Sequence, residues 1–110
     1  PEVTGLAHEC DIPFEVCISS NRHSTAIGEL DEHPFSRMLM AGLNVTINTD
    51  TPEVTHASLG EEYRTVCEDM GLTRQVLAGR ILAAARAAFL PPAERAALAH
   101  RLRTQLTGPL

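Results

Sequence analysis

Aromatic residues are scarce in this chain of 110 residues, which has no tryptophan, one tyrosine and three phenylalanines. The interior must therefore be built mainly from Leu, Val, Ile, Met and Ala side chains. Hydrophobic residues make up 44% of the sequence, a share that is typical of a globular protein and not of a disordered one. A chain of this length can form one domain with a modest core.

Several other features are missing, and each absence excludes a class of protein. No apolar run approaches the roughly 20 residues that a transmembrane helix needs, and no signal peptide is recognisable, so we expect a cytoplasmic protein with no membrane partner. A net charge of −5 without a basic patch argues against nucleic-acid binding. The three cysteines form no C-x-x-C pair, which favours reduced thiols and argues against a zinc site made of thiolates.

The pattern of apolar residues predicts two strands separated by a helix and followed by three more helices. The predicted strands cover 14–18 and 43–49, a polar, turn-rich segment covers 19–28, and the predicted helices cover 35–41, 58–70, 73–88 and 93–106. Charged residues of the last three helices are expected on their solvent-exposed faces. Two strands joined by a crossover helix pair in parallel. A parallel sheet buries both of its faces, so two strands alone should form an incomplete sheet that other polypeptide completes.

Asp50 directly follows the second predicted strand and allows two interpretations. It can form an Asx-turn or a helix N-cap before Pro52. Alternatively, its carboxylate points into a pocket as a metal ligand or general base, because α/β folds place their chemistry at the carboxyl ends of parallel strands. Thr46, Asn48 and Asp50 share one face of the strand by the period-two rule, which favours the second interpretation.

Polar residues also follow the first predicted strand, at Ser19-Ser20-Asn21. A short hydroxyl beside a carboxylate can orient it, although an ordinary turn explains the same residues. The five histidines form no H-x-H or H-x-x-x-H pair, so any metal site here is partial. His33 is expected to pack or cap at a helix start beside Pro34, and Cys17 is expected to act as a small buried hydrophobe.

Five segments form a recognisable set when they are taken in order. They are Phe14 to Asn21, Glu32-His33-Pro34, Gly42 to Pro52, Ser58-Leu59 with Glu62-Tyr63, and Ala88-Phe89-Leu90-Pro91. Together they resemble the C-terminal part of the adenosine deaminase family, and their spacing matches that family along nearly the whole chain.

The family that the sequence resembles is a zinc-dependent TIM barrel, a fold of eight strands and eight helices. It replaces the 6-amino group of adenosine-like purines with oxygen and releases ammonia. The resemblance implies an α/β fold in which the two strands are the last two of the barrel, with 1–110 as the C-terminal fragment of a single deaminase-like domain. The implied partners are a missing N-terminal part of the barrel and a purine nucleoside or base.

The resemblance also implies roles for three residues. The family's strand-end motif reads N-T-D-D-P; its first Asp is a zinc ligand and matches Asp50, and its second Asp touches the purine ring and matches Thr51. The family serine after the preceding strand matches Ser20, which implies a partner for the metal carboxylate. The family's other zinc ligands and its catalytic residues lie upstream of Pro1, so we expect no catalytic residue in this chain and no activity from it alone.

Thr51 is the main departure from the family, because threonine cannot carry the charge of aspartate. Two hypotheses therefore stand side by side. The chain is either part of an adenosine deaminase-like hydrolase, with the choice of substrate altered at Thr51, or a non-catalytic, degenerate deaminase-like module that acts in protein interaction.

Overall fold

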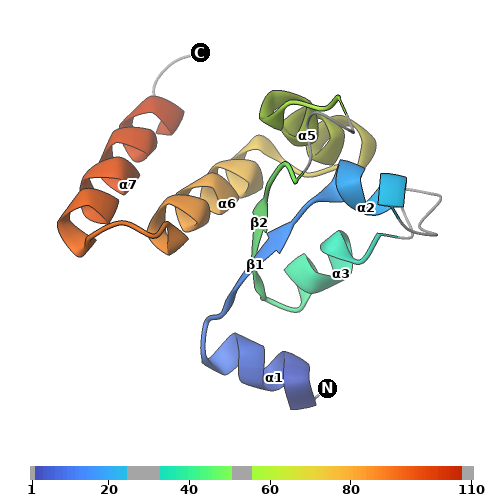
Figure 1. The fold of residues 1–110 in the computed structure, drawn as a ribbon, viewed down its shortest axis with the longest axis horizontal. Coiled ribbons are helices and arrows are strands. Elements are labelled where there is room, and N and C mark those ends of the chain that lie inside the picture. The colour runs from blue at the N-terminus through green and yellow to red at the C-terminus, as the bar shows by residue number, and fades with distance from the viewer. Residues whose placement is uncertain (1, 25–32, 51–55, 108–110) are drawn as a thin grey trace.

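The computed structural model describes residues 2–24, 33–50 and 56–107 as a short parallel sheet with helices around it (Figure 1). The elements in chain order are α1 (Glu2–Glu9), β1 (Pro13–Val16), α2 (Ile18–Ser24), α3 (Phe35–Met40), β2 (Asn44–Ile47), α5 (Leu59–Arg64), the π-helical segment η2 (Thr65–Asp69), α6 (Arg74–Ala87) and α7 (Pro92–Thr107). None of the helices in these ranges has the length and apolar content to cross a membrane.

Strands β1 and β2 pair in parallel, and the Cα partners run from Pro13 and Asn44 to Val16 and Ile47. The connection between the two strands carries α2 and α3, while α6 packs against β2 (Figure 1). The predicted α/β arrangement with a parallel strand pair is therefore confirmed. Within the described ranges the sheet contains these two strands and no others.

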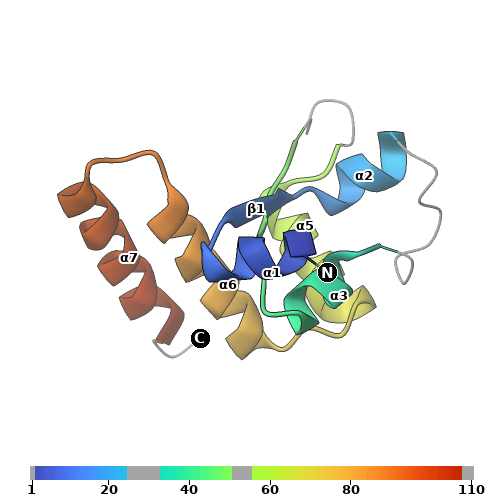
Figure 2. The same cartoon turned by 90° about the horizontal axis from the view of Figure 1, so that it is seen from below.

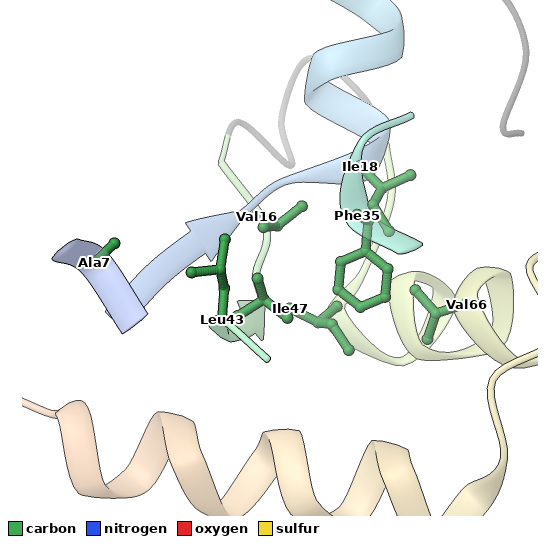
Figure 3. Packing of buried hydrophobic residues seen from close by; sticks show 8 residues of the cluster. Ala7, Val16, Ile18, Phe35, Leu43, Ile47 and Val66 are labelled. Atoms are coloured by element: carbon green, nitrogen blue, oxygen red, sulfur yellow. The ribbon is translucent and has the colours of Figure 1, made fainter. Parts of the chain in front are cut away.

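The hydrophobic core lies on one face of the sheet. Val16 and Ile47 are register partners, so their side chains project from the same face. Phe35 of α3 and Val66 of η2 reach this cluster, and both are completely buried (Figure 3). Burying a side chain such as Phe35 stabilises the fold by about 1.5–3 kcal/mol. The same cluster fixes where the helices sit on the sheet.

The first strand ends earlier than the sequence predicted. β1 stops at Val16, and α2 begins at Ile18, within the segment that was expected to be strand and polar turn. The Asn21 N–H donates to the Cys17 carbonyl at 2.8 Å, which closes the first turn of α2. Ile18 is completely buried, so burial of this residue outweighs the turn preference of the polar residues that follow. Residues 25–28 of the predicted turn lie outside the described ranges.

The later helices begin where the sequence predicted. The Ser58 side chain accepts from the Glu61 N–H, and Glu61 reaches back to the Ser58 backbone, forming the predicted capping box. Thr73 caps α6 by accepting from the Val76 N–H at 3.2 Å. The π-helical turn of η2 was not predicted. It ends before Gly71, whose φ of +79° is a left-handed conformation that glycine adopts without strain.

Glu62 corrects the expectation that the charged residues of these helices lie on the surface. It is 1% exposed, whereas Glu61 beside it is exposed. Glu62 stands four positions before Val66, which is completely buried in the core. The local pattern gave no sign of this burial, since a lone glutamate among polar neighbours normally faces solvent.

Removing the Ser58 cap should destabilise the protein by about 1 kcal/mol, because the Glu61 N–H loses its acceptor. We expect Ser58→Ala to lower the free energy of unfolding by this amount in chemical denaturation. Ser58→Asp is the matched control, since aspartate is an equally good N-cap. Equal losses in the two variants would show that the capping hydrogen bond is not what stabilises this helix start.

Candidate functional site

Asp50 and Ser20 meet at the carboxyl edge of the strand pair. Ser20 lies in the first turn of α2 after β1, and Asp50 lies just beyond β2, so the parallel pairing brings both residues to one edge (Figure 1). The Ser20 Oγ donates to Asp50 Oδ2 at 2.9 Å across 30 positions of sequence. Ser20 is 8% exposed, while Asp50 is exposed. A buried hydroxyl thus holds one oxygen of a carboxylate whose other side faces outward.

A short polar ladder leads along β2 toward Asp50. The Asn48 Nδ2 donates to Thr46 Oγ1 at 2.9 Å, and the Thr46 hydroxyl donates to the Phe14 carbonyl at 3.1 Å. Thr46 is 2% exposed, so its hydroxyl is paired where water does not reach. The hydrogen bond between Thr46 and Asn48 agrees with the prediction that these residues share one face of the strand.

His33 ties the start of α2 to the start of α3. The Phe35 N–H donates to His33 Nδ1 at 3.1 Å, so Nδ1 accepts and Nε2 carries the ring proton. Nε2 then donates to Asn21 Oδ1 at 3.0 Å, and Asn21 is the neighbour of Ser20. Burial lowers the pKa of His33 below its usual 6.5, which keeps the ring neutral. The predicted capping role of His33 is confirmed, but its link to Asn21 had no signal in the sequence.

Cys17 lies between the strand and the site and behaves as a thiol. Burial is the main cause that raises the pKa of Cys17, and the nearby carboxylates of Asp50, Glu15 and Glu62 raise it further. A protonated thiol is a poor nucleophile. These surroundings agree with the expected structural role of Cys17, although the residue is only partly buried.

Thr51 lies outside the described residues, and so do residues 52–55. His56 is exposed, with a φ of +60°. Across ranges 2–24, 33–50 and 56–107, no three His, Cys, Asp or Glu side chains gather in a way that could hold a metal ion.

Asp50 nevertheless fits one position of a metal site. Carboxylate oxygen is a normal zinc donor, and a zinc site needs about three or four protein ligands. With Oδ2 oriented by Ser20, the Asp50 carboxylate is presented in the way that ligating carboxylates usually are, with a hydrogen bond from behind. This edge can therefore supply one ligand and its orienting partner.

Two surface hollows lie away from this edge. An open hollow of about 930 Å³ between α6 and α7 is lined mainly by apolar side chains such as Leu77, Ile81 and Leu106. A second hollow, of about 550 Å³, is lined by three arginines, a histidine and two alanines. Neither includes Ser20 or Asp50, so the polar edge of the sheet is distinct from both.

Comparison with known proteins identifies the family of this chain. Residues 3–105 match the family model described as adenosine deaminase. The chain belongs to the adenosine deaminase family. It is similar to the aminodeoxyfutalosine deaminase of Streptomyces avermitilis, with 39% identity over 101 residues, which is 90% of this chain and 28% of that protein. It is also similar to the adenine deaminase of Chelativorans sp., with 38% identity over 103 residues, which is 94% of this chain and 32% of that protein.

The solved structures agree on the fold. The crystal structure of the adenine deaminase from Arthrobacter aurescens matches 97% of this chain with a TM-score of 0.90 and 23% identity, and the match covers 33% of that protein. At this identity the likeness concerns the fold alone. The chain thus spans about a third or less of the length of these similar proteins.

Acid should destabilise the protein through His33. The lowered pKa of the buried ring means that the unfolded chain takes up a proton near pH 6.5 while the folded state resists it. The contribution to stability is therefore present above this pH and is lost as the pH falls below it. We expect the free energy of unfolding to decline more steeply between about pH 7 and pH 5 for the wild type than for His33→Asn, which cannot be protonated.

The exposed His100 provides the control for this measurement. His100→Asn should keep the steep decline of the wild type, because it removes an exposed ring and leaves the buried ring of His33 in place. Parallel pH profiles for the wild type and His33→Asn would contradict the role that we give to His33.

Proposed function

We propose that this chain is the C-terminal part of a zinc-dependent deaminase that hydrolyses the 6-amino group of adenosine, adenine or a related purine. The observation that carries the proposal is the hydrogen bond from Ser20 Oγ to Asp50 Oδ2 at the carboxyl edge of the parallel strands. The chain belongs to the adenosine deaminase family, which supports a role in deamination for this oriented carboxylate. The names of the similar proteins, which are deaminases of adenine and of aminodeoxyfutalosine, support the same reaction class.

In this proposal β1 and β2 are the last two strands of a (β/α)8 barrel. The two-stranded sheet is too small to stand by itself, and its carboxyl edge has the position at which TIM barrels carry their active sites. The remaining strands and the other metal ligands then come from polypeptide that precedes this chain. The fold likeness to the Arthrobacter adenine deaminase over 33% of its length supports this arrangement.

Asp50 is the residue that would hold the metal ion in this chain. A zinc ion held there would lower the pKa of a water molecule and would supply a hydroxide near neutral pH. Ser20 keeps the Asp50 carboxylate in one orientation, and His33 holds Asn21, next to Ser20, at the same edge. In the overall reaction, water oxygen replaces the amino group on the purine carbon, and the amino group leaves as ammonia.

Thr51 is the residue that we propose to contact the purine, next to the metal ligand. Its hydroxyl can donate a hydrogen bond to a ring nitrogen or accept one, but it cannot act as an anionic acceptor as the family's aspartate does. The preferred substrate is therefore expected to differ from that of family members with two aspartates. The two named relatives act on different substrates, adenine and aminodeoxyfutalosine, so variation in substrate choice already exists among similar proteins.

Asp50→Ala should abolish stoichiometric zinc binding in the full-length protein, because one of the few ligands is lost. Ser20→Ala should keep the ligand but weaken zinc binding by about 10–100-fold, because the carboxylate loses its orienting hydrogen bond. Elemental analysis and chelator competition measure the two effects, and Ser19→Ala is the matched control with wild-type affinity expected. Full zinc content in Asp50→Ala would refute the role of Asp50 as a metal ligand. Residues 1–110 by themselves should show no deaminase turnover.

Thr51→Asp should raise the turnover of adenosine relative to the wild type, because it restores the charged acceptor of the family motif. Steady-state kinetics of the full-length protein with adenosine, adenine and other 6-aminopurines would show which substrate gains. Thr55→Asp, the same substitution four positions further along the sequence, is the control for the added negative charge. Unchanged turnover of all these substrates in Thr51→Asp would mean that the substrate pocket differs from that of the family at further positions. No deamination by the wild type on any of these substrates would favour the non-catalytic alternative.

A further inference from the structure

Glu62 is a buried carboxylate that the proposed mechanism does not use. It is 1% exposed and ranks with Phe35, Ile18, Val45 and Val66 among the largest completely buried side chains. Within the described part of the chain, no donor lies within hydrogen-bonding distance of its Oε2 atom. A buried carboxylate oxygen without a donor is costly and rare in native proteins, so its retention requires a physical cause.

Packing does not supply that cause. Glu62 lies one helical turn before Val66, on the face that α5 and η2 turn toward the core. A leucine or methionine would fill such a position without a desolvation cost. The carboxylate therefore needs a favourable partner that the described residues do not supply.

Glu62 lies on the helix that packs against the strand leading to Asp50. Helix α5 contacts β2 and lies near the carboxyl end of that strand and the start of α2 (Figures 1 and 2). Burial is the main cause that raises the pKa of the Cys17 thiol, and the carboxylates of Asp50 and Glu62 both raise it further. Asp50 is exposed at the edge of the sheet, whereas Glu62 is buried.

We propose that Glu62 is a charge-balancing residue for the cation that Asp50 binds, acting through space without coordinating the metal. This inference rests on the proposed function, because it needs a metal ion at Asp50. In a medium of low dielectric constant, a divalent cation stabilises a nearby buried carboxylate. By thermodynamic reciprocity the carboxylate strengthens binding of the cation to the same extent.

The test compares Glu62→Gln with Glu68→Gln in the full-length protein, each with and without zinc. Both changes remove one negative charge from the same helical segment, but Glu68 is exposed. Chelator competition should show zinc binding about tenfold weaker in Glu62→Gln and within about twofold of the wild type in Glu68→Gln. Zinc-free Glu62→Gln should melt at or above the Tm of the zinc-free wild type, so that zinc raises its Tm by less than in the wild type.

Glu62→Met provides a second variant if the glutamine variant fails to fold, because it removes the charge and fills the same space with an apolar side chain. This variant should have a higher Tm than the wild type without zinc and should bind zinc more weakly. A gain in stability together with a loss of zinc affinity is not expected for a residue with a purely structural role. Unchanged zinc affinity in both variants would overturn the inference. So would an equal loss of Tm with and without zinc, which would assign Glu62 to a structural hydrogen bond. A wild-type protein that binds no zinc would overturn the proposed function itself.

Discussion

The parallel pairing of β1 and β2 is the constraint on which the rest of this structure depends. It brings Ser20 and Asp50, which are 30 positions apart, within 2.9 Å of each other. A slip of one residue in the register would turn every side chain of one strand to the opposite face. Val16 and Ile47 would then leave their shared core face, and Asp50 would lose its place beside the Ser20 hydroxyl. Fold and site are thus fixed by the same apolar contacts.

The residues that support the site are more buried than the carboxylate that they hold in place. Asp50 is exposed, the Ser20 hydroxyl that holds it is buried, and His33, which holds the neighbouring Asn21, is 3% exposed. Each buried polar group in this series has a partner, which keeps the edge rigid without a buried polar group left unpaired. Such an arrangement can present one oxygen donor in a defined direction, and this is the property that a metal ligand requires.

The parts of this fold that could be predicted from the sequence are those that neighbouring residues determine. Ser58 and Glu61 form their capping box within one helical turn, and Thr73 caps α6 in the same way, so both helix starts were predictable. The early start of α2, the contact of His33 with Asn21 and the burial of Glu62 depend on segments that are distant in the sequence. No local pattern carries that information, because tertiary packing overrides local propensity.

The two carboxylates near the carboxyl end of the sheet have opposite environments. Asp50 is exposed and accepts a hydrogen bond, whereas Glu62 is buried and no described residue donates to its Oε2. Considered alone, Asp50 resembles an ordinary turn residue, and Glu62 is a buried carboxylate with an oxygen that no described residue pairs. The cation proposed at Asp50 would account for both, since it would need an oriented ligand and would gain from a second negative charge nearby. Burying the Glu62 carboxylate costs free energy whether or not a metal ion is bound. We therefore expect a buried glutamate here only if the metal-bound protein is the functional form.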